Sequence, residues 1–282
     1  IDQQDGQTLQ QHHALEPNVR KSVTLPEPHN EEERWYCNRL VNEALNAVRL
    51  NDGSPVHINV PISEPLFEYD VPKLPDERNI FMLHATTDYF SVREMAVDFF
   101  RGKKLMFVLG QLTPEVVGNS LEAIEALKKV AVVLQEKLAD DNICPAQPID
   151  EVLKMIGEDE DYRPDHLIYI GGTIVSKRLR QFLRECKCKM SIVVNGIDEF
   201  CDTFMHTTDM IQGLPEDVIG IFANETEGVK KRDFVTLWDK AFDKALAIRK
   251  TIKPRFSQML AVKAFHEKMR EEAVDGKLFY GN

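Results

Sequence analysis

Short runs of apolar residues alternate, in the middle of the chain, with longer stretches in which apolar positions recur every three or four residues. The runs are 105–109, 130–134, 167–170, 190–194 and 218–222, each bounded by Gly, Pro or charged residues. Runs of this kind are typical of parallel strands covered on both faces, and the stretches between them have helical spacing. The pattern therefore predicts an α/β fold whose central domain, residues 88–224, contains a doubly wound parallel sheet.

The sequence before this region predicts only part of another α/β domain. Residues 31–50 have the spacing of a helix with a buried face formed by Cys37, Val41, Ala44, Leu45 and Val48. Val56–Val60 predicts a strand, and a short helix is expected near Thr8–His13. One helix and one strand beside a polar start bury too little surface for a complete domain.

The remaining segments complete the predicted domain organisation. Prolines and acids between 61 and 75 are typical of an extended linker. Two amphipathic helices are expected after residue 224, followed by the start of a strand at 277–280. We therefore expect a partial domain at 1–65, a linker at 66–87, the central domain, and a second partial domain at 225–282.

Charge and composition exclude several classes of protein. The 282 residues carry a net charge of -11, which argues against nucleic acid or an anionic membrane surface as the main partner. No apolar run approaches the roughly 20 residues of a membrane span, and no signal peptide opens the chain, so a cytoplasmic location is expected. The five cysteines lack zinc spacing, and Cys186 and Cys188 are expected to be reduced thiols. No metal site is predicted.

The candidate site lies in the segment HLIYIGGTIVSKRLR, residues 166–180. It predicts a buried strand that turns at Gly171-Gly172 into a helix, with Lys177 and Arg178 in the first turn. The start of a helix is positive, so two cations beside free backbone N–H groups indicate that an anion binds there. Solvated side chains remain the alternative, and the strict P-loop pattern is absent.

Glycines follow other predicted strands as well, which leaves further functions open. Ligands of such sheets bind at the carboxyl ends of the strands, where Gly110-Gln111, Gly171-Gly172 and Asn195-Gly196 are expected. A flavin- or nicotinamide-binding oxidoreductase domain is one alternative, although the GxGxxG fingerprint is absent. A non-enzymatic effector-binding or scaffold module is the other.

Several motifs resemble one enzyme family. The segment GSPVHINVP at 53–61, followed by EPL at 64–66, is the most specific of them. Others are SVTLPEP at 22–28 with RW at 34–35, GQ at 110–111, GG with SKRL at 171–179, and LFYGN at 278–282. Together they resemble the 2-succinyl-5-enolpyruvyl-6-hydroxy-3-cyclohexene-1-carboxylate synthases of menaquinone biosynthesis, which are thiamine diphosphate enzymes. Ile62-Ser63 and Gly6 depart from the residues usual in that family.

The resemblance implies that the chain is the middle of a longer synthase. The parent would decarboxylate 2-oxoglutarate on thiamine diphosphate with Mg²⁺ or Mn²⁺ and add the product carbanion to isochorismate, as a homodimer or homotetramer. Lys177 and Arg178 match the family's basic substrate clamp, and Gln7 matches a polar substrate contact. The activating glutamate and the metal motif of the family have no counterpart here, so the fragment is expected to lack catalytic, cofactor-binding and metal residues and to be inactive alone.

Overall fold

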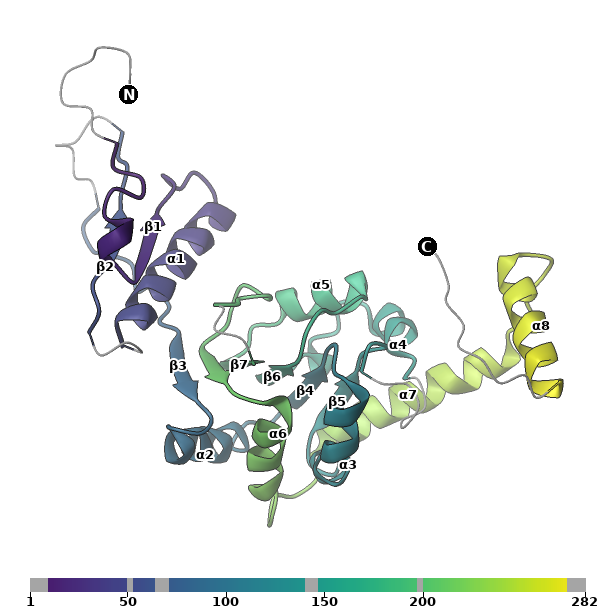
Figure 1. The fold of residues 1–282 in the computed structure, drawn as a ribbon. Helices are drawn as coiled ribbons and strands as arrows, with labels where there is room; N and C mark the ends of the chain where they lie inside the picture. The colour runs from purple at the N-terminus through teal and green to yellow at the C-terminus, as the bar shows by residue number, and fades with distance from the viewer. Residues whose placement is uncertain (1–9, 50–52, 64–70, 140–146, 197–199, 273–282) are drawn as a thin grey trace.

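Six parallel strands form the main sheet of the protein. Figure 1 shows the fold in a computed structural model. The structure describes residues 10–49, 53–63, 71–139, 147–196 and 200–272. The strand order is β3-β8-β7-β6-β4-β5, and all pairs are parallel. The strands are β3 (Phe81–His84), β4 (Leu105–Leu109), β5 (Val132–Gln135), β6 (His166–Ile170), β7 (Met190–Asn195) and β8 (Asp209–Gln212). The predicted α/β class with a doubly wound parallel sheet is confirmed.

Helices cover both faces of this sheet. One face is covered by α2 (Tyr89–Phe99), α3 (Pro114–Lys128) and α6 (Pro215–Asn224), and the other by α4 (Ile149–Ile156), α5 (Lys177–Glu185) and α7 (Asp233–Thr251). Each face has its own apolar core, one centred on Phe99 and Phe222 and the other on Trp238. Both faces of the sheet are therefore shielded from solvent in its middle, which explains why its central strands are continuous apolar runs.

The strand predicted at 218–222 is wrong, because these residues lie within α6. Pro215 stands at the first helical position and Glu216 follows it, both of which favour a helix start. The apolar side chains then lie at helical spacing against α3. Two strands of the main sheet were missed instead: β8 begins at the charged Asp209, and β3 is an edge strand with an exposed first residue. A third strand, Lys21–Thr24 in the first part of the chain, was missed as well. β3 lies within residues assigned to the linker, and the domain boundaries stay a prediction.

The first part of the chain forms a small unit of its own. A 3-10 turn (Glu16–Asn18) leads into β1 (Lys21–Thr24), which pairs in parallel with β2 (Val56–Asn59), and α1 (Glu31–Arg49) packs on both strands. The buried residues of α1 are Leu40, Asn42, Ala44 and Asn46. The helix itself is confirmed, but the predicted buried face is wrong at Leu45, which is 42% exposed.

Asparagines join α1 to the edge of the main sheet. Asn46 donates to the carbonyl of Ile80 (2.8 Å), and Asn42 accepts from the Ile80 amide (2.8 Å). Asn42 and Asn38 both donate to the carbonyl of Arg78 (2.9 Å each). The three asparagines recur every four positions and form one polar stripe on α1. This stripe supplies hydrogen-bond partners for the backbone just before the edge strand β3.

The last described helices differ in how they pack. The first half of α7 lies against the sheet with Trp238 fully buried, whereas α8 (Gln258–Glu271) buries no side chain. A second 3-10 turn (Glu160–Tyr162) packs beside α7. The predicted strand at 277–280 lies outside the described residues, as do residues 8 and 9 of the predicted helix at 8–13. Its described part, residues 10–13, leads into a turn, so the helix prediction is wrong there. Among the described helices none is long and apolar enough to cross a membrane.

Candidate functional site

The predicted pair of cations stands at the start of α5. The helix begins at Lys177, and the hydroxyl of Ser176 caps it by accepting a hydrogen bond from the Leu179 amide (3.0 Å). Both cationic side chains are exposed. Arg178 donates to the carbonyl of Asp150 (2.9 Å), and Lys177 makes no hydrogen bond or ion pair with the residues that the structure describes. The strand, double-glycine turn and helix are confirmed in this order.

The carboxylate of Glu136 lies at the start of α5, where the sequence predicted that an external anion binds. Glu136, directly after β5, is 4% exposed, and its Oε1 accepts hydrogen bonds from the amides of Val175 and Ser176 (3.1 Å each). Its Oε2 accepts from the Leu138 amide (3.0 Å). Two backbone N–H groups before the helix are therefore taken by the protein itself. The side chains of Lys177 and Arg178, and not these amides, are what the loop presents to a ligand.

A second carboxylate braces the same loop from α4. The Ser176 hydroxyl donates to Asp150 Oδ1 (2.5 Å), so Ser176 is held on one side by its amide and on the other by its hydroxyl. Because Asp150 lies in α4 and Glu136 directly follows β5, the start of α5 is positioned before any ligand arrives. Neither Glu136 nor Asp150 was singled out from the sequence. The only available signal was an acidic residue directly after a buried strand.

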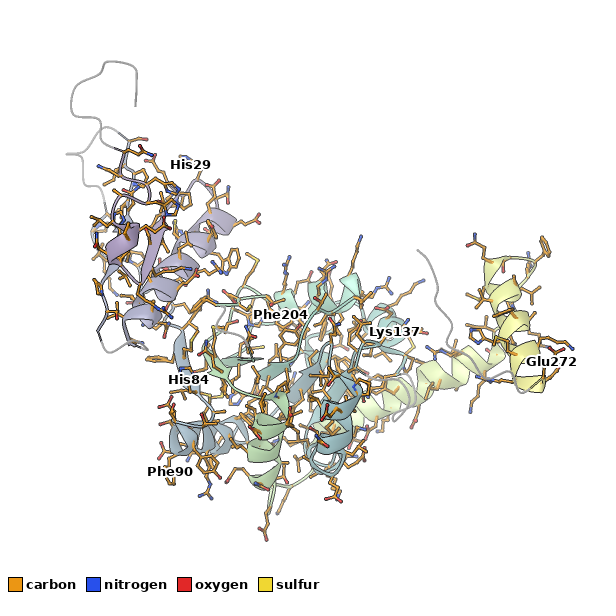
Figure 2. The ribbon with its side chains drawn as sticks, in the orientation of Figure 1. His29, His84, Phe90, Lys137, Phe204 and Glu272 are labelled. Carbon is orange, nitrogen blue, oxygen red and sulfur yellow. The ribbon has the colours of Figure 1, made fainter. Side chains whose placement is uncertain are left out.

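A pocket of about 330 Å³ opens between these elements. Its lining includes Glu136, Lys137, Asp150, Glu151, Ser176 and Arg249. Lys137, one of these lining residues, is labelled in Figure 2 and marks the position of the pocket. Arg249 and Glu151 form an ion pair of 2.5 Å across it. Burial raises the pKa of Glu151, but the hydrogen bond and charge of Arg249 outweigh it and leave that pKa below its ordinary value. The pocket therefore contains both signs of charge.

The glycines at the ends of β4 and β6 serve close packing of two loops. The Gly172 amide donates to the carbonyl of Gln111 (2.8 Å), and Gly171 adopts a φ of 95°. A Cβ atom on Gly110 would lie 2.3 Å from the Gly172 carbonyl oxygen. The hydroxyl of Tyr169 donates to that same oxygen, and burial raises the Tyr169 pKa to about 12. At this point, where the strand order reverses, the backbones meet directly.

The other predicted site residues are placed as follows. Gln7 lies outside the described residues. Asn195 at the end of β7 donates to the sulfur of Cys201 (3.4 Å), 6 positions later in the chain. No group of three or more His, Cys, Asp or Glu side chains that could hold a metal ion occurs among the described residues. The structure thus places Lys177 and Arg178 in the first turn of α5, and their role stays a prediction.

Comparison with known proteins places the chain beside two bacterial synthases. It is 36% identical over 220 residues to the 2-succinyl-5-enolpyruvyl-6-hydroxy-3-cyclohexene-1-carboxylate synthase of Bacteroides thetaiotaomicron, a match covering 76% of this chain and 40% of that protein. It is 31% identical over 269 residues to the synthase of the same name from Porphyromonas gingivalis, covering 89% and 45%. The chain thus spans less than half the length of the curated relatives it matches.

Two other comparisons add little. No family model matches the chain. Among solved structures, benzoylformate decarboxylase from Polynucleobacter necessarius is similar with a TM-score of 0.30 and 13% identity, covering 78% of this chain and 40% of that one. A likeness this weak carries no argument about function.

Proposed function

We propose that this chain, which is homologous to part of the 2-succinyl-5-enolpyruvyl-6-hydroxy-3-cyclohexene-1-carboxylate synthases, is the middle portion of such an enzyme. The complete enzyme decarboxylates 2-oxoglutarate and adds the resulting four-carbon carbanion to isochorismate. The matches cover most of this chain but less than half of each relative, which supports the proposal that the chain is one portion of the enzyme. A cytoplasmic location and assembly as a homodimer or homotetramer belong to the same proposal.

Within this enzyme, Lys177 and Arg178 bind the carboxylates of isochorismate. The observation that carries this role is the pair of exposed cations at the start of α5, on a loop that Glu136 and Asp150 hold in place. Isochorismate is a dianion, and a hydrogen bond to a charged group contributes about 1.5 to 3 kcal/mol. A braced loop loses little conformational entropy on binding, so more of that energy appears as affinity. Gln7 supplies a further polar contact.

The parent enzyme uses thiamine diphosphate with Mg²⁺ or Mn²⁺, which supplies the carbanion chemistry when bound. The described residues offer no cluster of metal ligands, so no part of that chemistry is assigned to them. Their role is to bind and orient the acceptor. We infer that the isolated chain is inactive, so adding thiamine diphosphate and Mg²⁺ should not enable it to decarboxylate 2-oxoglutarate. Carbon dioxide release from 2-oxoglutarate above a no-protein control would contradict this.

The substrate assignment is tested in the full-length parent. Lys177→Ala and Arg178→Ala should each weaken the use of isochorismate by about 2 kcal/mol, roughly 30-fold in kcat/KM, while decarboxylation of 2-oxoglutarate is retained. Lys187→Ala, a substitution of another exposed lysine, serves as the control and should change neither step. Unchanged constants for isochorismate in both test variants would exclude the assignment.

A further inference from the structure

A basic cavity lies at the amino end of β4, whereas the candidate site follows the carboxyl ends of the strands. It has a volume of about 730 Å³ and lies between the residues that precede β4 and the start of α7. Five cations line it: Lys103, Lys104, Lys231, Arg232 and Lys240. Asp161 and Asp233 are the acids of the lining, so the cavity carries an excess of three positive charges in a chain whose net charge is -11. The overall composition of this acidic chain does not account for the local excess of positive charge.

Most of these cations are weakly paired or unpaired. Lys104 approaches Asp161 at 3.5 Å, and Lys231 pairs with Asp239 at 2.8 Å, both with exposed acids. Ion pairs of this kind contribute little to stability because water screens them. Lys103, Arg232 and Lys240 form no ion pair with any residue that the structure describes. Three cations of the cavity therefore have no carboxylate within ion-pair distance among the described residues.

Arg232 is the most informative of the three. It is partly buried, and its guanidinium donates only to backbone carbonyls, those of Phe100 and Lys230. Burial lowers the pKa of Arg232, and the charge of Asp165 only partly offsets this. The Asp165 carboxylate is itself bonded to the amides of Lys103 (3.0 Å) and Lys104 (2.8 Å). Because Arg232 is partly buried and has no carboxylate within ion-pair distance in the described part of the chain, a bound anion would offset the cost of its partial desolvation.

We propose that this cavity binds a diphosphate group, with Arg232, Lys103 and Lys240 as its cationic contacts. The planar guanidinium suits two oxygens of one phosphate, and the ammonium groups act as point charges for the rest. The volume lies in the range of small-molecule sites, so the group can be free diphosphate or part of a phosphorylated molecule. The inference is independent of Lys177, Arg178 and the proposed reaction, since it uses none of their residues.

Calorimetric titration of the 282-residue chain with sodium pyrophosphate, at constant ionic strength, tests the proposal. We expect saturable binding with one site per chain, and a loss of affinity of about tenfold or more in each of Arg232→Met, Lys103→Met and Lys240→Met. Lys154→Met, an exposed lysine of α4, is the control and should bind like the unaltered chain. Lys103 and Lys240 are exposed, so their variants keep the test valid if Arg232→Met does not fold.

Two further titrations separate the possible ligands. Binding of ADP as tight as that of pyrophosphate, and lost in the same variants, would support a diphosphate carried on a larger molecule. Succinate is a dianion without phosphate oxygens and should bind more than tenfold more weakly. The proposal is overturned if pyrophosphate does not bind saturably, if the three variants bind it unchanged, or if succinate binds equally well.

Discussion

Gly110 occupies a position where even a methyl group has no room. The nearest atom to a methyl group added at this position would be a backbone oxygen, that of Gly172, which cannot rotate away as a side chain could. The close approach joins the loops after β4 and β6 beside the start of α5. Position 110 therefore requires glycine because the two loops leave no space for a Cβ atom.

We expect Gly110→Ala to destabilise the protein by about 1 to 3 kcal/mol, because the two backbones must separate. Gly118 in α3 is the matched control, since a Cβ there meets nothing within 4 Å. Gly118→Ala should stabilise the helix by about 0.5 to 1 kcal/mol. Urea denaturation measures both, and equal effects of the same sign would contradict the steric explanation.

Asp202 is the residue that ties the first unit to the main sheet electrostatically. Its side chain is 0% exposed, and it pairs with Arg78 at 2.7 Å. It also accepts hydrogen bonds from Trp35 Nε1 (2.6 Å) and the Thr207 amide (3.0 Å). Burial raises the Asp202 pKa, but Arg78 and the other donors outweigh it, so this pKa lies below its ordinary value.

A lowered carboxylate pKa gives a defined dependence of stability on pH. The ion pair should stabilise the fold above the unfolded-state pKa, near 3.8, and this contribution should disappear as the pH falls through the lower pKa of the folded state. Asp202→Asn should cost about 2 to 4 kcal/mol at pH 7. The difference from the unaltered protein should shrink below pH 4, as measured by thermal unfolding between pH 3 and 7. A constant difference would contradict this account.

At the scale of elements, α1 shows that a buried helix face need not be apolar. Asn42 and Asn46 are as buried as Leu40 because they bond to the backbone beside the edge strand β3. The stripe of amide side chains satisfies N–H and C=O groups of the backbone just before this edge strand, as a neighbouring strand would. The stripe also explains how a helix of the small unit comes to lie against the main sheet.

Asn42→Ala should destabilise the contact between α1 and the main sheet by about 1 to 3 kcal/mol. The reason is that the Ile80 amide loses its partner in a place that water does not reach. Hydrogen exchange of the 78–84 segment should accelerate, while exchange in β6 is retained. Leu45→Ala, on the exposed side of the same helix, is the control and should leave exchange in both segments unaltered.

The whole molecule has an uneven distribution of apolar surface. The main sheet is covered on both faces, but α8 exposes Met259, Val262 and Phe265, and Phe256 before it is fully exposed. Exposed apolar residues on one helix promote association with other surfaces.

We therefore expect the isolated chain to bind a hydrophobic dye and to associate at high concentration. Met259→Lys combined with Phe265→Lys should reduce both, because charge replaces apolar surface on α8. Asn119→Lys with Gln181→Lys adds the same charge at exposed positions of α3 and α5 and serves as the control. Sedimentation velocity and dye fluorescence provide the measurements. Equal reductions in both double variants would show that charge alone, and not α8, is responsible.

Local sequence was sufficient for the main elements of this protein. Buried parallel strands such as β4 and β6 require continuous apolar residues, so they are visible without any knowledge of their neighbours. The start of α5 was likewise readable, because Ser176 and the double glycine before it act within a few residues. The resemblance to the synthase family also rests on short local motifs, and the comparisons bear it out.

Tertiary structure decided what those elements contact. The apolar residues of α6 suit either a strand or a helix, and their packing against α3 settles the choice. The burial of Asn42 depends on a backbone segment 36 positions away, and the Glu136 contact to Ser176 spans 40 positions. Hydrogen bonds between residues so distant leave no periodic pattern in the sequence, because each partner satisfies the other only once the chain has folded.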